Sequence, residues 1–152
     1  MNKRKVMITG TSTGLGLAFA RRCLARDDMV YGLSRSGCPL EHQDLVDLEF
    51  DLANLSNIDA ALGVLLEGVT HLDLLILNAG ILGEIQPMAE LEMDRLSEVM
   101  DINVWSNKAI LDSLHARGIQ VDQVIAISSG AAVNGNKGWG AYSLSKATLN
   151  ML

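Results

Sequence analysis

Near its amino terminus the chain reads Thr9-Gly10-Thr11-Ser12-Thr13-Gly14-Leu15-Gly16, a glycine-rich turn between two apolar segments. The short apolar run at 6–8 is typical of a buried strand, and the stretch at 15–26 has the apolar spacing of a helix. Glycines in such a turn let the backbone approach a pyrophosphate, which the N-terminus of the following helix attracts. We therefore expect the residues from Gly10 to Gly16 to bind the phosphates of a dinucleotide. A flexible loop without a ligand is the alternative, and the position between strand and helix makes it less favoured.

Beyond this turn, short apolar runs continue to alternate with longer amphipathic stretches. The runs predict strands at 30–33, 46–50, 73–77 and 123–127, and the stretches predict helices at 57–66, 93–117 and 141–152. Strands that alternate with helices pair in parallel through right-handed crossovers. The sequence thus predicts a doubly wound α/β fold of Rossmann type, with about five strands and helices on both faces, as a single domain over 1–152. The very apolar strand at 73–77 is expected at the centre of the sheet.

The composition limits the class of protein and of partner. Of the 152 residues, 49% are hydrophobic and 20% are charged, as in globular proteins, and the formal net charge is −6. A negative chain without a basic patch is not expected to bind nucleic acid or an anionic membrane. Cys23 and Cys38 form no CxxC pair, and the apolar runs are too short for a secretory signal or a membrane span. We therefore expect a cytoplasmic protein with reduced thiols and no metal site.

Further motifs lie at the ends of the predicted strands and in the helices that follow. They are Asp51-Leu52, Asn78-Ala79-Gly80, Asn103 in the long helix, Ser128-Ser129, and the YxxxK motif Tyr142-Ser143-Leu144-Ser145-Lys146. YxxxK alone is a weak signal, because an exposed helical pair without function explains it equally well. Together with the TGxxxGxG turn, however, this ordered set resembles the classical short-chain dehydrogenase/reductase family. The interval of 13 residues before Tyr142 matches the family spacing and selects Ser129 over Ser128.

The resemblance implies a nicotinamide-dependent oxidoreductase whose catalytic residues are Asn103, Ser129, Tyr142 and Lys146. Lys146 lies one helical turn after Tyr142, so both side chains share a face, and a nearby ammonium favours the ionised phenol that acid–base catalysis requires. The resemblance further implies that Ser129 holds the substrate oxygen and that Asn103 helps to position Lys146. It places Asp51-Leu52 against the adenine ring. In the same way, it implies that Asn78-Ala79-Gly80, Tyr142 and Lys146 line the cofactor cleft.

The residues after the second predicted strand indicate which nicotinamide is bound. An acidic residue there would bind the ribose hydroxyls of NAD(H) and repel a 2′-phosphate. This chain has Ser34-Arg35-Ser36 instead. Arg35 can form charge-assisted hydrogen bonds with a 2′-phosphate, and either serine can add another. The sequence therefore favours NADP(H) over NAD(H), the alternative being an Arg35 that is merely solvated.

The resemblance also implies what surrounds this unit. Members of the family are longer, so the chain is expected to be C-terminally truncated, without the last strands and the substrate lid. The strand at 123–127 would then be an exposed sheet edge. Relatives associate through the long helix and the YxxxK helix, so a homodimer or homotetramer is expected.

The residues just before Tyr142 bear on the substrate. The stretch Gly138-Trp139-Gly140-Ala141-Tyr142 resembles the C-factor and sniffer-like carbonyl reductases, which favours small or hydrophobic carbonyls. The leading hypothesis is an NADP(H)-dependent oxidoreductase acting on a small-molecule carbonyl or alcohol. The alternatives are a non-catalytic NADP(H)-binding module and an inactive truncated fragment.

Overall fold

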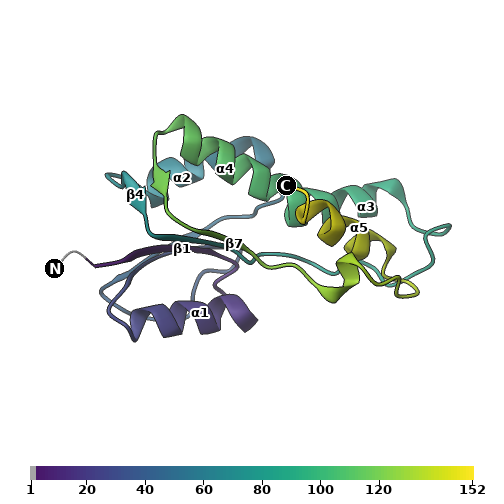
Figure 1. Cartoon of the computed structure of the whole chain (residues 1–152), viewed down its shortest axis with the longest axis horizontal. Helices are drawn as coiled ribbons and strands as arrows, with labels where there is room; N and C mark the ends of the chain where they lie inside the picture. Colours follow the sequence, from purple (N-terminus) through teal and green to yellow (C-terminus); the bar gives the residue numbers. More distant parts are fainter. Residues whose placement is uncertain (1–2) are drawn as a thin grey trace.

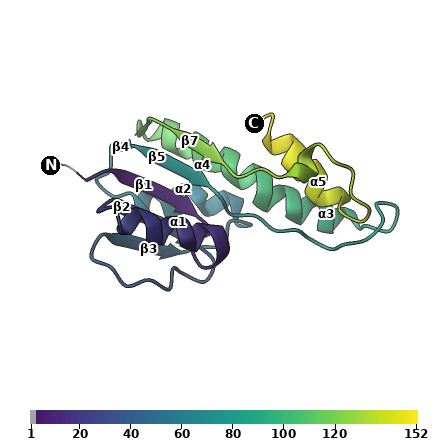
Figure 2. The same ribbon diagram turned by 60° about the horizontal axis from the view of Figure 1, so that its bottom comes forward.

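A parallel sheet of five strands forms the centre of the structure, a computed structural model that describes residues 3–152. Residues 1 and 2, which the predicted domain includes, lie outside the described residues. The strand order is β3-β2-β1-β5-β7 (Figure 2). The strands are β1 (Lys5–Thr9), β2 (Met29–Ser34), β3 (Leu45–Glu49), β5 (Leu74–Leu77) and β7 (Val124–Ala126). Each neighbouring pair is parallel, which confirms the predicted doubly wound sheet.

Helices cover both faces of the sheet (Figure 1). Helix α1 (Gly14–Leu24) lies on one face, and α2 (Ile58–Leu65) and α4 (Ser106–Ala116) lie on the other. Side chains of a strand alternate between its two faces. Accordingly, Val6 and Ile8 of β1 belong to the buried cluster that includes residues of α1, whereas Met7 belongs to the cluster with α2 and α4. Burial on both faces explains why the strands are apolar without alternation.

The position of two strands in the sheet refines the sequence prediction. Strand β5 is buried throughout, as expected, but β1 and not β5 holds the middle place. Strand β7 forms an edge, as predicted, and leaves Val124 and Ile125 43% and 38% exposed. A second, two-stranded parallel sheet pairs β4 (His71–Leu72) with β6 (Gln120–Val121). This pair was not predicted from the sequence, because strands of two residues show no periodicity in their apolar residues.

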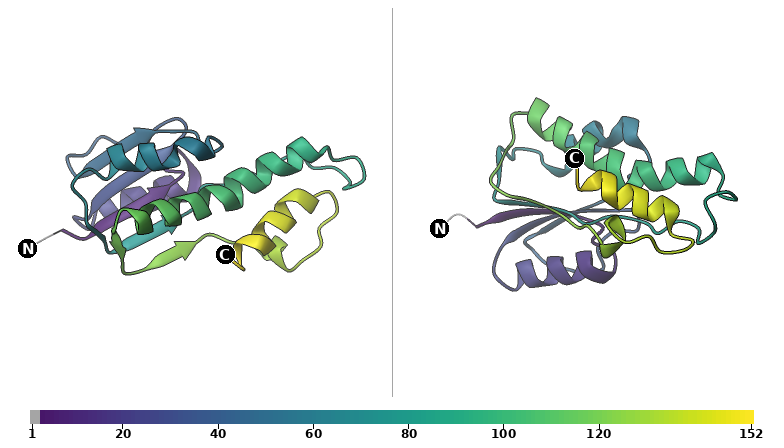
Figure 3. Two further views of the ribbon diagram at one scale, coloured as in Figure 1. Left: turned by 90° about the horizontal axis from the view of Figure 1, so that it is seen from above. Right: turned by 45° about the vertical axis from the view of Figure 1, so that its right-hand side comes forward.

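The long helix predicted at 93–117 is present, but it is not α-helical throughout. Helix α3 (Met93–Met100) continues into a π-helical segment, η2 (Asp101–Trp105), and then into α4. Helix α5 (Gly140–Leu149) lies beside this long helical segment (Figure 3). Single 3₁₀ turns, η1 (Leu55–Asn57) and η3 (Gly130–Ala132), complete the chain. Within residues 3–152, none of the helices has the length and apolar character needed to cross a membrane.

Candidate active site

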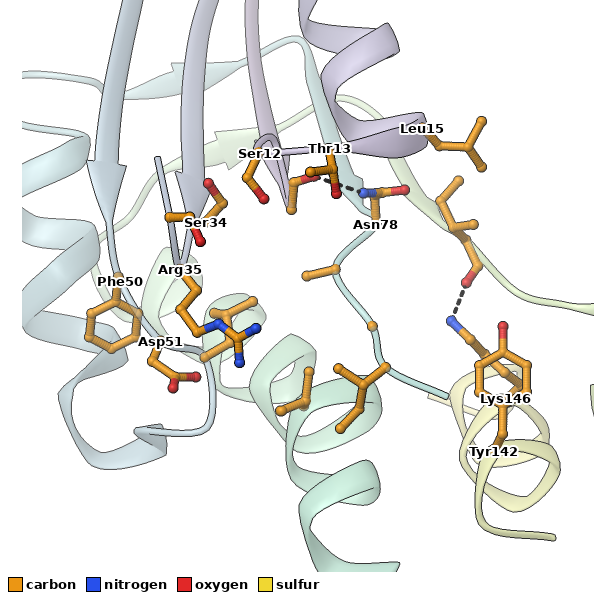
Figure 4. A pocket seen from close by; sticks show the side chains of 18 residues that line it. Ser12, Thr13, Leu15, Ser34, Arg35, Phe50, Asp51, Asn78, Tyr142 and Lys146 are labelled. Atoms are coloured by element: carbon orange, nitrogen blue, oxygen red, sulfur yellow. Dashed lines mark hydrogen bonds between the residues drawn. The ribbon is translucent and has the colours of Figure 1, made fainter. Parts of the chain in front are cut away.

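A cleft of about 450 Å³ opens at the carboxyl ends of the parallel strands, where ligands of doubly wound sheets bind. The glycine-rich turn and Asn78 lie at one side of it, Arg35 and Asp51 at a second, and Tyr142 and Lys146 at a third (Figure 4). Fourteen of the residues predicted from the sequence line it: Gly10, Ser12, Thr13, Leu15, Ser34, Arg35, Ser36, Asp51, Leu52, Asn78, Ala79, Gly80, Tyr142 and Lys146. Motifs far apart in the sequence thus meet at one place.

The glycine-rich turn is held close to the end of β5. The side-chain amide of Asn78 donates to the carbonyl oxygens of Thr9 at 3.0 Å and Gly10 at 3.4 Å. The backbone N–H groups of Asn78 and Ala79 each donate to the hydroxyl of Thr9 at 3.0 Å. A Cβ at position 16 would overlap the Gly10 carbonyl oxygen, so only glycine allows helix and turn to approach this closely. The first turn of α1 is thereby aimed into the cleft, where its dipole favours an anion.

One end of the cleft is formed by the turn after β2. Ser34 is the last residue of the strand and is buried, whereas Arg35 and Ser36 are exposed. The Arg35 side chain extends into the cleft near Asp51 (Figure 4). A guanidinium in this position can bind a planar or tetrahedral anion through several N–H groups at once.

The opposite end is formed by helix α5. The ammonium nitrogen of Lys146 donates a 2.7 Å hydrogen bond to the carbonyl oxygen of Ile127, just after β7 (dashed in Figure 4). It lies 5.6 Å from the centre of the Tyr142 ring, and the two rings of Trp139 and Tyr142 meet edge to face with centroids 5.9 Å apart. Lys146 is only 4% exposed, and burial lowers the pKa of its ammonium.

Asn103 is fully buried in the π-helical segment, where it joins three parts of the site. Its Oδ1 accepts a 2.7 Å hydrogen bond from the N–H of Ile81, and its Nδ2 donates to the Ile81 carbonyl oxygen at 2.8 Å. Nδ2 also donates to the hydroxyl of Ser145 at 2.9 Å, which in turn donates to the carbonyl oxygen of Tyr142. Asn103 therefore acts on α5 through Ser145, next to Lys146, and not through a hydrogen bond to the lysine itself.

Five of the predicted residues do not line the cleft: Thr11, Gly14, Gly16, Asn103 and Ser129. The Ser129 hydroxyl accepts the N–H of Ala131 and caps η3. The neighbouring Ser128 donates to the side chain of Asn150 at 2.6 Å. Four lining residues escaped the sequence analysis: Phe50, Ile81, Ile102 and Ile127. All four directly flank a predicted site residue or a strand end, which is the signal that could have found them.

Comparison with known proteins agrees with this arrangement. Residues 4–152 match the short chain dehydrogenase family. A benzil reductase ((S)-benzoin forming) of Bacillus subtilis is 34% identical over 95% of this chain and 63% of its own length. A 2-(R)-hydroxypropyl-CoM dehydrogenase of Xanthobacter autotrophicus is 30% identical over 98% of this chain and 65% of its own length. The chain thus spans a little under two thirds of these relatives.

Solved structures show the same fold. A short chain dehydrogenase/reductase from Saccharomyces cerevisiae superposes with a TM-score of 0.84 at 26% identity, covering 97% of this chain and 62% of that one. Another from Burkholderia vietnamiensis gives 0.81 at 30% identity, covering 98% and 74%. The family match covers nearly all of this sequence, and the glycine-rich turn, Asn78-Ala79-Gly80 and the YxxxK pair meet in one cleft. The chain belongs to the short chain dehydrogenase family.

Proposed function

We propose that this chain carries the cofactor site and the acid–base pair of an oxidoreductase that transfers a hydride between NADP(H) and a carbonyl compound or secondary alcohol. One observation carries the proposal: the glycine-rich turn, the Ser34-Arg35-Ser36 turn and the pair Tyr142 and Lys146 line a single cleft. A turn suited to a pyrophosphate, an Arg35 suited to a 2′-phosphate, and a proton donor with a neighbouring cation together suit carbonyl reduction by NADPH.

The residues present fit a nicotinamide dinucleotide. The Gly10 carbonyl oxygen lies so close to Gly16 of helix α1 that a Cβ at position 16 would overlap it. The N-terminus of α1 faces the cleft. At this terminus the Thr13 side chain makes no capping hydrogen bond to the described first turn, which leaves N–H groups for a pyrophosphate. When bound, the reduced dinucleotide supplies the hydride.

The chain itself supplies the proton. Reduction leaves negative charge on the substrate oxygen, and the Tyr142 hydroxyl is the group in the cleft suited to donate a proton to it. The Lys146 ammonium, 5.6 Å from the ring, stabilises the phenolate that remains. Asn103 and Ser145 hold this end of α5 against the loop that contains Ile81. In the reverse direction, the same phenolate accepts the proton of an alcohol.

The preference for NADP(H) rests on the adenosine end of the cleft. Arg35 and Ser36 are exposed there, and no acidic residue occupies the turn itself. A 2′-phosphate brings negative charge that the Arg35 guanidinium neutralises through charge-assisted hydrogen bonds. The hydroxyls of Ser34 and Ser36 are further candidate donors.

A second candidate is a nucleotide-binding module without turnover, and the position of Ser129 favours it. The Ser129 hydroxyl is engaged with the Ala131 N–H and does not line the cleft, although family resemblance assigns it to the substrate oxygen. In this case the dinucleotide binds but no hydride is transferred.

Consumption of NADPH by this chain distinguishes the two candidates. The substrate panel should include hydrophobic ketones such as benzil, because three of the similar proteins are benzil reductases. We expect oxidation of NADPH that Tyr142→Phe abolishes while NADPH binding is retained. Tight NADPH binding without turnover on any ketone or aldehyde would support the second candidate and contradict the first.

The substrate-side surface and the association of chains complete the proposal. Trp139 packs edge to face on Tyr142 and helps to fix the orientation of the Tyr142 ring toward the substrate. Trp105 and Leu144, on η2 and α5, are 43% and 48% exposed, which fits a homodimer or homotetramer formed through these helical segments. Sizing of the purified chain tests the association, and a clean monomer would contradict it.

A further inference from the structure

Asp47, in the middle of strand β3, makes hydrogen bonds with two separate segments beside the cleft. Its Oδ2 atom accepts a 2.7 Å hydrogen bond from the backbone N–H of Cys38. Its Oδ1 atom lies 3.3 Å from the hydroxyl oxygen of Thr11, which donates to it from within the glycine-rich turn. The Thr11 hydroxyl oxygen also lies 3.2 Å from that of Ser34. The half-buried carboxylate of Asp47 therefore links β3 to the glycine-rich turn and to the turn after β2.

The space for this carboxylate is provided by Gly32, its partner in the β2–β3 register. A glycine inside a strand is less favourable than alanine by roughly 0.5–1 kcal/mol, so its presence calls for a reason in the packing. A Cβ at position 32 would overlap Asp47 Oδ1 and would lie 3.1 Å from Thr11 Oγ1. The gap left by Gly32 is thus where the Asp47 side chain crosses β2 to reach Thr11.

The segment that carries Arg35 is fixed at both of its ends. At one end the Ser34 carbonyl oxygen accepts a 3.0 Å hydrogen bond from the N–H of Phe50. At the other end the Cys38 N–H donates to Asp47. Only residues 35–37 lie between these two hydrogen bonds. The position of the Arg35 guanidinium therefore depends on how the backbone of this short segment is fixed. Ordering the backbone before binding reduces the entropy that binding has to overcome.

We propose that Asp47 is a positioning residue for recognition of the 2′-phosphate, and that it acts by holding the turn at 34–38 so that Arg35 and Ser36 face the adenosine end of the cleft. The inference rests on the proposed NADP(H) function. Asp47 does not line the cleft, so it acts through the turn and not by touching the cofactor. Removal of the Asp47 side chain should therefore weaken the binding of NADPH more than the binding of NADH, because only NADPH carries the 2′-phosphate.

Fluorescence titration of NADPH and NADH into the whole chain tests this proposal. Asp47→Ala, which removes the acceptor, should weaken NADPH binding roughly three- to tenfold, the loss expected for about one hydrogen bond. NADH binding should change by less than about twofold, since no 2′-phosphate is involved. Asp47→Asn keeps one acceptor oxygen for the Cys38 N–H, and its NH2 group can donate to the Thr11 hydroxyl oxygen, so it should retain most of the NADPH affinity. Gly32→Ala displaces the carboxylate and should reproduce the selective loss of Asp47→Ala.

Glu67→Gln removes an exposed carboxylate that does not line this cleft and is the matched control. Thermal melting checks that each variant is folded, and Asp47→Asn and Gly32→Ala still decide the question if Asp47→Ala does not fold. Equal weakening of NADPH and NADH, or unchanged NADPH binding in both Asp47→Ala and Gly32→Ala, would overturn the positioning role alone. A wild-type chain that binds neither dinucleotide would instead overturn the proposed function, and this inference with it.

Discussion

The ammonium nitrogen of Lys146 lies 5.6 Å from the centre of the Tyr142 ring while it donates a hydrogen bond to the carbonyl oxygen of Ile127. The carbonyl fixes the lysine at the end of β7, so the cation stays near the phenol without depending on a bound ligand. The cost of this arrangement is a buried charge. Function and stability therefore place opposite demands on Lys146.

Replacement of Lys146 by Met tests this conflict through its pH dependence. Burial lowers the pKa of the Lys146 ammonium in the folded chain. At pH values between this lowered pKa and the ordinary lysine pKa of about 10.4, the unfolded chain therefore binds more protons than the folded chain. The free energy of unfolding of the wild type should rise with pH across this interval, relative to the variant. Thermal melts from neutral to alkaline pH should show any advantage of Lys146→Met shrinking.

Lys137→Met, which removes an exposed lysine, controls for the loss of one positive charge in these melts. A difference between wild type and Lys146→Met that stays constant with pH would contradict the buried-charge explanation.

Arg35→Ala should reduce affinity for NADPH selectively. Charge-assisted hydrogen bonds to the 2′-phosphate are lost, and the expected effect is roughly ten- to hundredfold on the NADPH dissociation constant. NADH binding should be nearly unchanged, and the difference between the two cofactors should decrease with added salt because the contact is exposed. Arg22→Ala, on the exposed side of α1, is the matched control. A variant that loses NADH and NADPH equally would show that Arg35 does not select the phosphate.

Gly16→Ala should disturb both folding and cofactor binding. The added Cβ would overlap the Gly10 carbonyl oxygen and lie 2.6 Å from the Asn78 side-chain nitrogen, so the turn and α1 must separate. Such overpacking costs roughly 1–3 kcal/mol of unfolding free energy, which urea denaturation measures. At Gly135 an added Cβ meets open space, so Gly135→Ala serves as the control. Wild-type stability and NADPH affinity in Gly16→Ala would refute the close-approach argument.

Asn103→Ala should destabilise the chain through unpaired backbone groups. The variant leaves the N–H and the carbonyl oxygen of Ile81 without the partners that they have now, and it frees Ser145. We expect a loss of roughly 2–4 kcal/mol in unfolding free energy, because buried polar groups without partners are costly. Asn136→Ala, at an exposed loop position, should stay within about 0.5 kcal/mol. Similar losses in both variants would argue against a special role for Asn103.

The sequence predicted the parallel sheet and most of the cleft because both depend on local signals. Apolar runs marked β1, β2, β3, β5 and β7, and the motifs follow those strands directly. The π-helical turn at Asn103 could not be read, since one widened turn barely changes the spacing of apolar residues along a long helix.

The roles of individual side chains were harder to foresee. The sequence did not indicate that the Thr11 hydroxyl lies between Ser34 and Asp47, and cofactor binding by Thr11 remains a prediction. The contacts of Asp47 depend on the register of β3 against β2 and on the gap at Gly32, and such register is a property of the folded sheet. The selection of Ser129 over Ser128 and the preference for NADP(H) remain predictions.

The most direct test of the central claim is a pair of equilibrium titrations, with NADPH and NADH, into the unmodified chain. If the glycine-rich turn, Arg35 and the YxxxK helix form one NADP(H) site, NADPH binds saturably to one site per chain and more tightly than NADH. Tighter binding of NADH would contradict the assignment of Arg35, and absence of binding by either dinucleotide would contradict the proposed site as a whole.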